Sequence, residues 1–237
     1  MRIIDIFFPQ NVKCIICGRE DNRYGLCEEC YNSLPFITGR TCVKCGGRVL
    51  DDQIVCDECA KYDHIFNKCY SIFDYDEVIK SKLIKFKQSG YKNIGQTLSY
   101  LVSEYLDNLD IDIDIIIPMP IHSNRLKDRG FNQSEILCER LTGRYKKLVI
   151  KDILFRILDT PHQTGLSRFN RMENLSGAFI LKKPSRIKGK KILLIDDIFT
   201  TGSTFDECAK VLYKAGAKTV DCLCLPRGLV YKKEKGK

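Results

Sequence analysis

The chain has 237 residues, of which 44% are hydrophobic, so it is long enough for one ordinary α/β domain and one small additional module. This composition excludes a disordered chain. The formal net charge of +9 favours partners that carry phosphate groups, although a solvated lysine surface would give the same total.

The first ten residues, MRIIDIFFPQ, are apolar but too short to cross a membrane. They contain Asp5, and no small-residue cleavage site follows them, so they do not read as a secretory signal. We interpret the segment as a short amphipathic helix that ends at Pro9. The sequence therefore predicts no membrane span.

Cysteine is abundant, with thirteen residues in the chain. Eight of them form four Cys-x-x-Cys pairs before residue 60: Cys14/Cys17, Cys27/Cys30, Cys42/Cys45 and Cys56/Cys59. The other five are scattered among apolar residues: Cys69, Cys138, Cys208, Cys222 and Cys224. A reduced thiol packs there like a small hydrophobic side chain. This mixture suits a reducing cytoplasm better than a disulfide scaffold, so we expect a cytoplasmic protein.

Each Cys-x-x-Cys pair closes a tight turn that points two thiolates at one ion, and two such turns complete a tetrahedral zinc site. Two structural Zn²⁺ ions are therefore predicted, in successive four-cysteine sites that resemble a double zinc ribbon. Interleaved pairing fits the same spacing, and an iron–sulfur cluster or a redox pair is a weaker alternative. A catalytic metal is not expected, because four thiolates leave no open position. We expect this module over residues 1–62 and infer that it serves a protein partner or the neighbouring domain.

Residues 63–237 show the pattern of a second domain. Apolar side chains recur at helical spacing from Ile79 to Phe86 and from Ile94 to Tyr105. Four short apolar runs span 113–117, 148–155, 192–195 and 220–225, and helices are predicted between them over 132–141 and 205–215. Buried strands that alternate with helices predict an α/β domain with a mostly parallel sheet flanked by helices. Ligands of such domains bind at the carboxyl ends of the strands.

The run from Ile192 to Ile195 is followed by Asp196 and Asp197 and then by a loop of small residues. The loop consists of Thr200, Thr201, Gly202, Ser203 and Thr204. Its backbone N–H groups and hydroxyls can bind a phosphate at the start of the next helix. The two carboxylates would repel a phosphate, so we expect them to accept hydrogen bonds from the vicinal hydroxyls of a ribose. An N-capped helix after a core strand would explain the hydroxyl residues but not the two acids.

This strand, acidic pair and loop resemble the phosphoribosyl-diphosphate signature of type I phosphoribosyltransferases. The resemblance implies that Asp196 and Asp197 are the catalytic pair and bind the ribose 2′ and 3′ hydroxyls. It also implies that the loop holds the 5′-phosphate and that Mg²⁺ accompanies the diphosphate of the ligand. The sequence contains neither a P-loop nor a dinucleotide fingerprint that would compete with this interpretation.

Further segments, together with the cysteine module, resemble the ComF family, which is linked with natural competence, the uptake and processing of single-stranded DNA. They are Gly90-Tyr-Lys-Asn-Ile-Gly95, Pro118-Met-Pro120, Arg129-Gly-Phe-Asn-Gln133, Gln163-Thr-Gly-Leu-Ser-Arg168 and Asn174-Leu-Ser-Gly-Ala-Phe179. Around the same segments, Arg125 and Arg129 could neutralise a diphosphate leaving group, and Arg168 and Arg171 could close over it as a lid. Solvated arginines are the alternative.

Two hypotheses of different class follow from these features. In the first, the chain binds phosphoribosyl diphosphate or a related sugar phosphate and transfers the phosphoribosyl group to an acceptor that the sequence does not name. In the second, it is an inactive binding module that uses the fold and its basic surface to bind single-stranded DNA or a competence or recombination protein. The basic stretches 80–92 and 156–191 are the candidate contacts with DNA.

Overall fold

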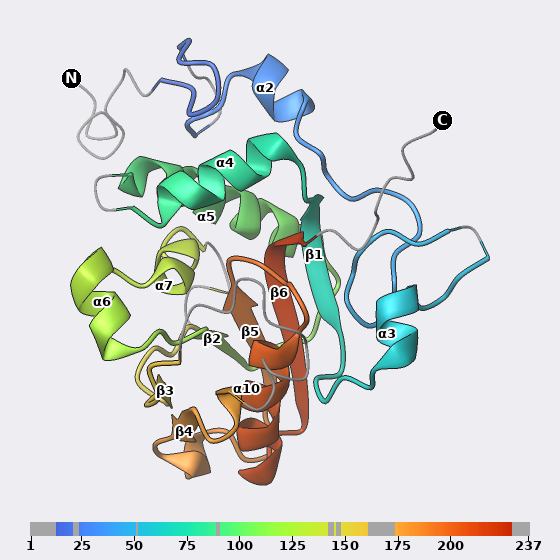
Figure 1. Ribbon diagram of the computed structural model, residues 1–237, viewed down its shortest axis with the longest axis vertical. Coiled ribbons are helices and arrows are strands. Elements are labelled where there is room, and N and C mark those ends of the chain that lie inside the picture. Colours follow the sequence, from blue (N-terminus) through green and yellow to red (C-terminus); the bar gives the residue numbers. More distant parts are fainter. Residues whose placement is uncertain are drawn as a thin grey trace.

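The computed structural model describes residues 13–20, 24–50, 52–88, 91–141, 145, 148–160 and 174–228. A four-stranded sheet in the order β1-β6-β5-β2 forms its centre (Figure 1). The strands are β1 (Cys69–Asp74), β6 (Thr219–Arg227), β5 (Lys191–Asp196) and β2 (Ile115–Pro118). Each neighbouring pair is parallel, so the carboxyl ends of all four strands lie at one edge of the sheet.

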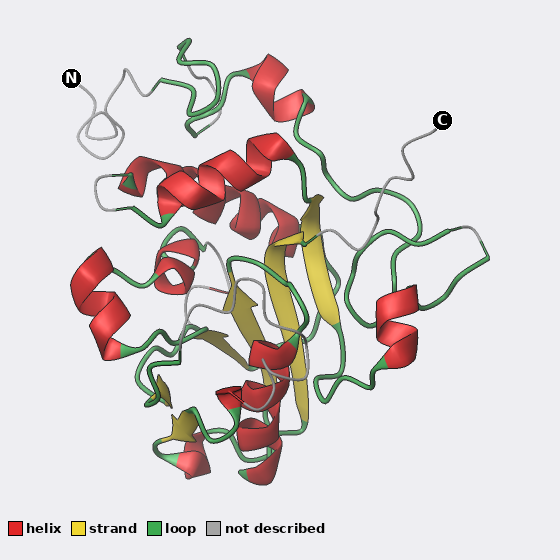
Figure 2. Cartoon of the chain, viewed as in Figure 1, coloured by secondary structure: helices red, strands yellow, loops and turns green. Residues whose placement is uncertain are grey.

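Helices cover both faces of this sheet (Figure 2). They are α4 (Glu77–Phe86), α5 (Lys92–Asp107) and α7 (Gln133–Leu137) on one face and α10 (Ser203–Lys214) on the other. In β5, Leu193 and Ile195 belong to the core beneath the first three helices, whereas Ile192 and Leu194 belong to the core beneath α10. A strand that is buried on both faces has a continuous apolar sequence, which explains the run seen here. The α/β class with a mostly parallel sheet is confirmed.

Shorter elements complete the described chain. They are α2 (Glu28–Asn32), α3 (Asp57–Lys61), α6 (Ser123–Arg129), η1 (Pro184–Arg186) and the antiparallel pair of β3 (Leu154–Arg156) with β4 (Phe179–Leu181). The helix predicted before Pro9 lies outside the described residues.

Two sequence predictions of local structure need correction, and one strand was missed. The run 148–155 is not one strand, because the polar pair Lys151 and Asp152 interrupts it: Val149 bridges β2, and β3 begins only at Leu154. The helix predicted over 132–141 ends at Leu137. Strand β1 was not predicted, since its sequence CYSIFD mixes polar and apolar residues although most of it is buried.

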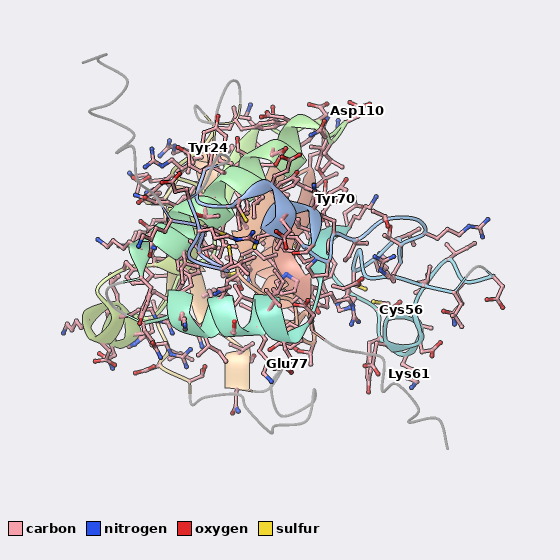
Figure 3. The ribbon with its side chains drawn as sticks, turned by 90° about the horizontal axis from the view of Figure 1, so that it is seen from above. Tyr24, Cys56, Lys61, Tyr70, Glu77 and Asp110 are labelled. Atoms are coloured by element: carbon pink, nitrogen blue, oxygen red, sulfur yellow. The ribbon has the colours of Figure 1, made fainter. Side chains whose placement is uncertain are left out.

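The two cysteine segments contact different parts of the α/β fold. Leu26 and Leu34 join the core under α4 and α5, and Tyr24 stacks on Tyr100 of α5 with ring centroids 4.1 Å apart. Figure 3 shows Tyr24 beside this helix, whereas Cys56 and Lys61 extend to one side of the molecule. There the second segment covers the edge of β1, where Cys69 N donates to the carbonyl of Lys44 (2.6 Å). The division at residue 62 stays a prediction.

Candidate functional site

Asp196 and Asp197 lie at the carboxyl end of β5, where hydrogen bonds hold the first side chain and an ion pair holds the second. Asp196 Oδ1 accepts hydrogen bonds from Ser134 Oγ (3.0 Å) and from the backbone N–H of Asp197 (2.9 Å). Asp197 is 7% exposed, and its Oδ2 forms an ion pair with Lys87 Nζ at 2.8 Å. Lys87 directly follows helix α4, so a helix from one face of the sheet supplies the cation for the strand end.

Burial and mutual repulsion govern the ionisation of this pair. Loss of solvation, followed by the charge of Asp197, raises the pKa of Asp196 to about 7. The negative charge of Asp197 raises the pKa of Lys87, which opposes the effect of its own burial. The site therefore holds two carboxylates that share one nearby ammonium group.

The loop after the acidic pair turns sharply at Gly202, whose φ of +77° lies in the left-handed region. A Cβ atom at Gly202 would come within 2.5 Å of His64 Cε1 and 2.8 Å of Phe199 Cζ, so the loop rests directly on these two rings. Thr201 Oγ1 and Ser203 Oγ lie 2.9 Å apart. The loop leads into the first turn of α10, where backbone N–H groups are available to an anion.

Beneath the loop, His64 links the start of α10 to the segment before β1. His64 Nδ1 lies 2.9 Å from Asp206 Oδ2, and Ile65 N donates to the other carboxylate oxygen of Asp206 at 2.7 Å. A carboxylate only accepts, so Nδ1 is the donor. His64 also stacks on Phe66, with centroids 4.5 Å apart. These contacts fix the floor of the loop.

The described arginines near the site have different surroundings. Arg129 ends α6, and burial together with the charge of Arg125 lowers its pKa, although the charges of Asp197 and Asp196 act in the opposite direction. Arg125 donates from Nη2 to the carbonyl of Thr160 at 2.7 Å, which places it beside the segment that precedes residue 161. The two other lid candidates, Arg168 and Arg171, lie outside the described residues.

The eight paired cysteines gather in two groups of four, Cys14, Cys17, Cys27 and Cys30 in one and Cys42, Cys45, Cys56 and Cys59 in the other. The structure thus combines successive pairs rather than interleaved ones. Gly18 and Gly46 close the first turn of each group with φ of +77° and +70°. Their N–H groups donate to the carbonyls of Cys14 and Cys42, both at 2.9 Å.

The sulfur positions fit tetrahedral zinc. A Zn–S bond of about 2.3 Å places neighbouring sulfurs about 3.8 Å apart in a tetrahedron. Cys17 and Cys27 have sulfurs 3.6 Å apart, and those of Cys45 and Cys56 are 3.7 Å apart. Within each group all four sulfurs lie within 4.8 Å of one another. Both groups can therefore hold a structural zinc ion that leaves no position open for a substrate.

Several residues of the site were missed in the sequence. Lys87 was interpreted only as part of a basic stretch, and Ser134 and His64 carried no motif. A lysine at the end of an amphipathic helix is ordinarily solvated, so nothing local distinguished Lys87. Asn132 was also given no role, although an asparagine at the start of a helical stretch is a recognisable N-cap signal. Its Nδ2 donates to the carbonyl of Met119 (3.0 Å), which ties the loop after β2 to α7.

Two known domain families match parts of this chain. Residues 3–60 match a double zinc ribbon domain, and residues 148–237 match a phosphoribosyl transferase domain. Competence protein F of Haemophilus influenzae is 30% identical over 92% of this chain and 97% of its own length. The DNA utilization protein YhgH of Shigella flexneri is 30% identical over 87% and 92%, and the competence protein ComFC of Streptococcus pneumoniae is 29% identical over 91% and 100%.

The chain belongs to the ComF family of competence proteins. Among solved structures, a hypoxanthine phosphoribosyltransferase from Staphylococcus aureus has a TM-score of 0.36 at 14% identity and covers 65% of this chain and 76% of its own. A purine phosphoribosyltransferase from Pyrococcus horikoshii has a TM-score of 0.31 at 18% identity, covering 58% and 74%. Likenesses this distant add nothing to the assignment. Within the described part of the chain, no helix is long and apolar enough to span a membrane.

The two cysteine groups predict about two zinc ions per purified chain, measured by elemental analysis against protein concentration. Cys17→Ser and Cys45→Ser should each lose about one zinc. Cys45→Ser should also lower the free energy of unfolding more, because Cys45 is fully buried against β1 whereas Cys17 is exposed. About one zinc in the wild type, or equal destabilisation by the two variants, would contradict this prediction.

The raised pKa of Asp196 predicts how pH affects stability. Between the ordinary pKa of 3.8 and about 7, the folded state keeps a proton that the unfolded state has lost, so stability falls as pH rises. Asp196→Asn removes this dependence. From about pH 5.5 to about pH 7.5, its free energy of unfolding should therefore gain about 2 kcal/mol relative to wild type. Urea denaturation at both pH values measures the difference, and a difference that does not change with pH would refute the assignment.

Proposed function

We propose that this chain binds phosphoribosyl diphosphate, or a closely related sugar phosphate, at the carboxyl end of β5. The main support is the acidic pair, of which Asp197 is buried and Asp196 half-buried, and which leads into a loop with a left-handed glycine at the start of α10. Carboxylates accept hydrogen bonds from vicinal hydroxyls, whereas N–H groups at a helix start bind phosphate. A single sugar phosphate provides both kinds of group.

In this proposal Asp196 and Asp197 accept hydrogen bonds from the ribose 2′ and 3′ hydroxyls, and residues 200–204 surround the 5′-phosphate. Lys87 balances the charge of Asp197 when no ligand is bound, and its ammonium can turn to a ligand oxygen when the hydroxyls arrive. Arg125 and Arg129 serve the diphosphate, with Arg168 and Arg171 as its lid. Mg²⁺, when bound with the diphosphate, would offset the negative charge of the leaving group.

Phosphoribosyl transfer is the reaction class that such a site would support. The ribose carbon becomes positively charged as the diphosphate leaves, so the protein acts by positioning the reactants and stabilising the leaving group. The names of the relatives refer to competence and DNA utilization. We therefore propose that the chain takes part in the uptake and processing of DNA during competence and that it works in the cytoplasm. The sugar-phosphate site would be its catalytic or regulatory centre.

Phosphoribosyl diphosphate with Mg²⁺ should raise the melting temperature of the wild-type protein, because a ligand that binds only the native state stabilises it by mass action. Asp197→Asn and Thr201→Ala should abolish this rise and remain folded. Asp152→Asn is the matched control, since Asp152 is an exposed carboxylate paired with Lys183. A wild type that does not respond at saturating ligand would refute the proposal.

Single-stranded DNA should bind weakly and electrostatically through the lysines on the outer side of α4. Lys80 and Lys85 are the test pair: Lys87 of the same stretch is held by the buried Asp197, whereas Lys85 is exposed and Lys80 pairs with the exposed Glu77. Each phosphate neutralised should contribute about −0.7 to the log–log slope of affinity against salt. Titration of a fluorescent oligonucleotide should show a smaller slope for the Lys80→Gln/Lys85→Gln variant.

The control for this titration is Lys210→Gln/Lys214→Gln on α10, which covers the opposite face of the sheet. Equal slopes for both double variants and the wild type would place DNA elsewhere. No binding at low salt would mean that the basic charge is a solvated surface, and the DNA role would then require a protein partner.

A further inference from the structure

Arg227, the last residue of β6, lies against the second cysteine group. Its Nε is 2.7 Å from Cys45 Sγ, and its Nη2 is 3.7 Å from Cys56 Sγ. The residue is only 8% exposed. Gly47, which follows the Cys42–Cys45 turn, lies so close to the Arg227 side chain that a Cβ atom there would clash with Arg227 Cδ. The guanidinium is therefore enclosed by the turn that carries two of the sulfurs.

The charge of this group explains why a cation is buried there. Four thiolates around one Zn²⁺ ion leave a net charge of −2, and this group is almost fully out of water, with Cys42 and Cys45 both at 0% exposure. A buried charge is costly unless it is paired and hydrogen-bonded. Arg227 supplies both N–H donors and a positive charge, as outer partners of metal ligands commonly do.

The other side of Arg227 contacts Phe199, which directly precedes residues 200–204. We call these residues the phosphate loop, because the proposed function places the 5′-phosphate there. Its guanidinium lies over the Phe199 ring, 5.4 Å from the centroid. Two backbone hydrogen bonds join the same strand end to Phe199: Phe199 N donates to the carbonyl of Pro226 (3.1 Å), and Gly228 N donates to the carbonyl of Phe199 (2.6 Å). The Phe199 ring in turn supports Gly202 from below.

We propose that Arg227 is a positioning residue that couples the metal in the second cysteine group to the shape of the phosphate loop. With zinc bound, the thiolates hold the guanidinium, and the guanidinium with the end of β6 holds Phe199 under Gly202. Without zinc, the sulfurs no longer form a fixed charged group, and Phe199 loses that support. Binding of the sugar phosphate therefore depends on this zinc ion. The inference rests on the proposed function.

The first cysteine group offers a matched comparison. Arg19 Nε lies 3.4 Å from Cys17 Sγ, so this group also has an arginine beside a sulfur. That arginine is 60% exposed and pairs with Glu29 at 2.6 Å, so its contacts with Cys17 and Glu29 both stay within the first cysteine segment. Arg19→Gln and Arg227→Gln thus remove the same chemical group from two similar settings, of which only one is linked to the loop.

The test measures zinc and ligand binding together on the full chain. Zinc loss is followed in competition with a coloured chelator, with and without phosphoribosyl diphosphate and Mg²⁺. Coupling between two binding sites is reciprocal, so the ligand should strengthen the retention of one of the two zinc ions. In Cys17→Ser, which keeps only the second group intact, the same strengthening should persist.

Arg227→Gln should weaken ligand binding about tenfold or more and remove the effect of the ligand on zinc, whereas Arg19→Gln should do neither. Arg227→Lys keeps the charge but not the forked donors, so it should fold and keep only part of the coupling. If the wild type binds ligand and zinc retention does not change, or if the two Gln variants behave alike, the inference is wrong and the proposed function stands. If the wild type does not bind ligand, both fail.

Discussion

Two adjacent carboxylates at the end of β5 set the main electrostatic constraint of this structure. Asp197 is nearly buried and Asp196 has its pKa raised to about 7, so their charge must be balanced from the surroundings. Lys87 and Ser134 meet this need from α4 and α7, which cover the same face of the sheet. The helices on this face therefore stabilise the site as well as the core, and a ligand that brings hydroxyl groups can take over part of their role.

The cysteine groups solve a different problem, which is to hold together two segments whose described helices, α2 and α3, have only five residues each. Their sulfurs fill positions that large side chains occupy elsewhere: Cys42 and Cys45 share a core with Phe66 and Ile115, whereas Cys14 and Cys30 join the core under α4. Zinc binding contributes directly to folding in such segments. Because each group packs on a different part of the α/β fold, loss of either metal should destabilise mainly the part of the fold that its group contacts.

The sequence allowed the class of the fold and the position of the strand–acid–loop motif to be predicted, because both depend on local patterns. Short apolar runs identified β5 and β6, and the Cys-x-x-Cys spacing identified both metal groups. Contacts between distant segments could not be predicted in this way. Lys87 and Asp197 are 110 positions apart, and only the packing of α4 on the sheet brings them together. Strand β1 was missed for a related reason, since its polar residues are satisfied by the cysteine turn, as when Ser71 Oγ donates to the carbonyl of Cys45 (2.9 Å).

The zinc ribbon contacts the surroundings of the acidic pair and its loop at two places. The first group rests on α4, whose C-terminal end carries Lys87, and the second group meets the end of β6 beside Phe199. The loop of residues 200–204 consists of small residues with few side-chain atoms to fix its shape, so its geometry must come from what lies beneath it. Here the floor consists of His64, from the segment before β1, and Phe199, from the loop after β5. Segments that contain only short helices can thus still support the loop, because metal–thiolate bonds supply the cross-links that longer helices and strands supply elsewhere.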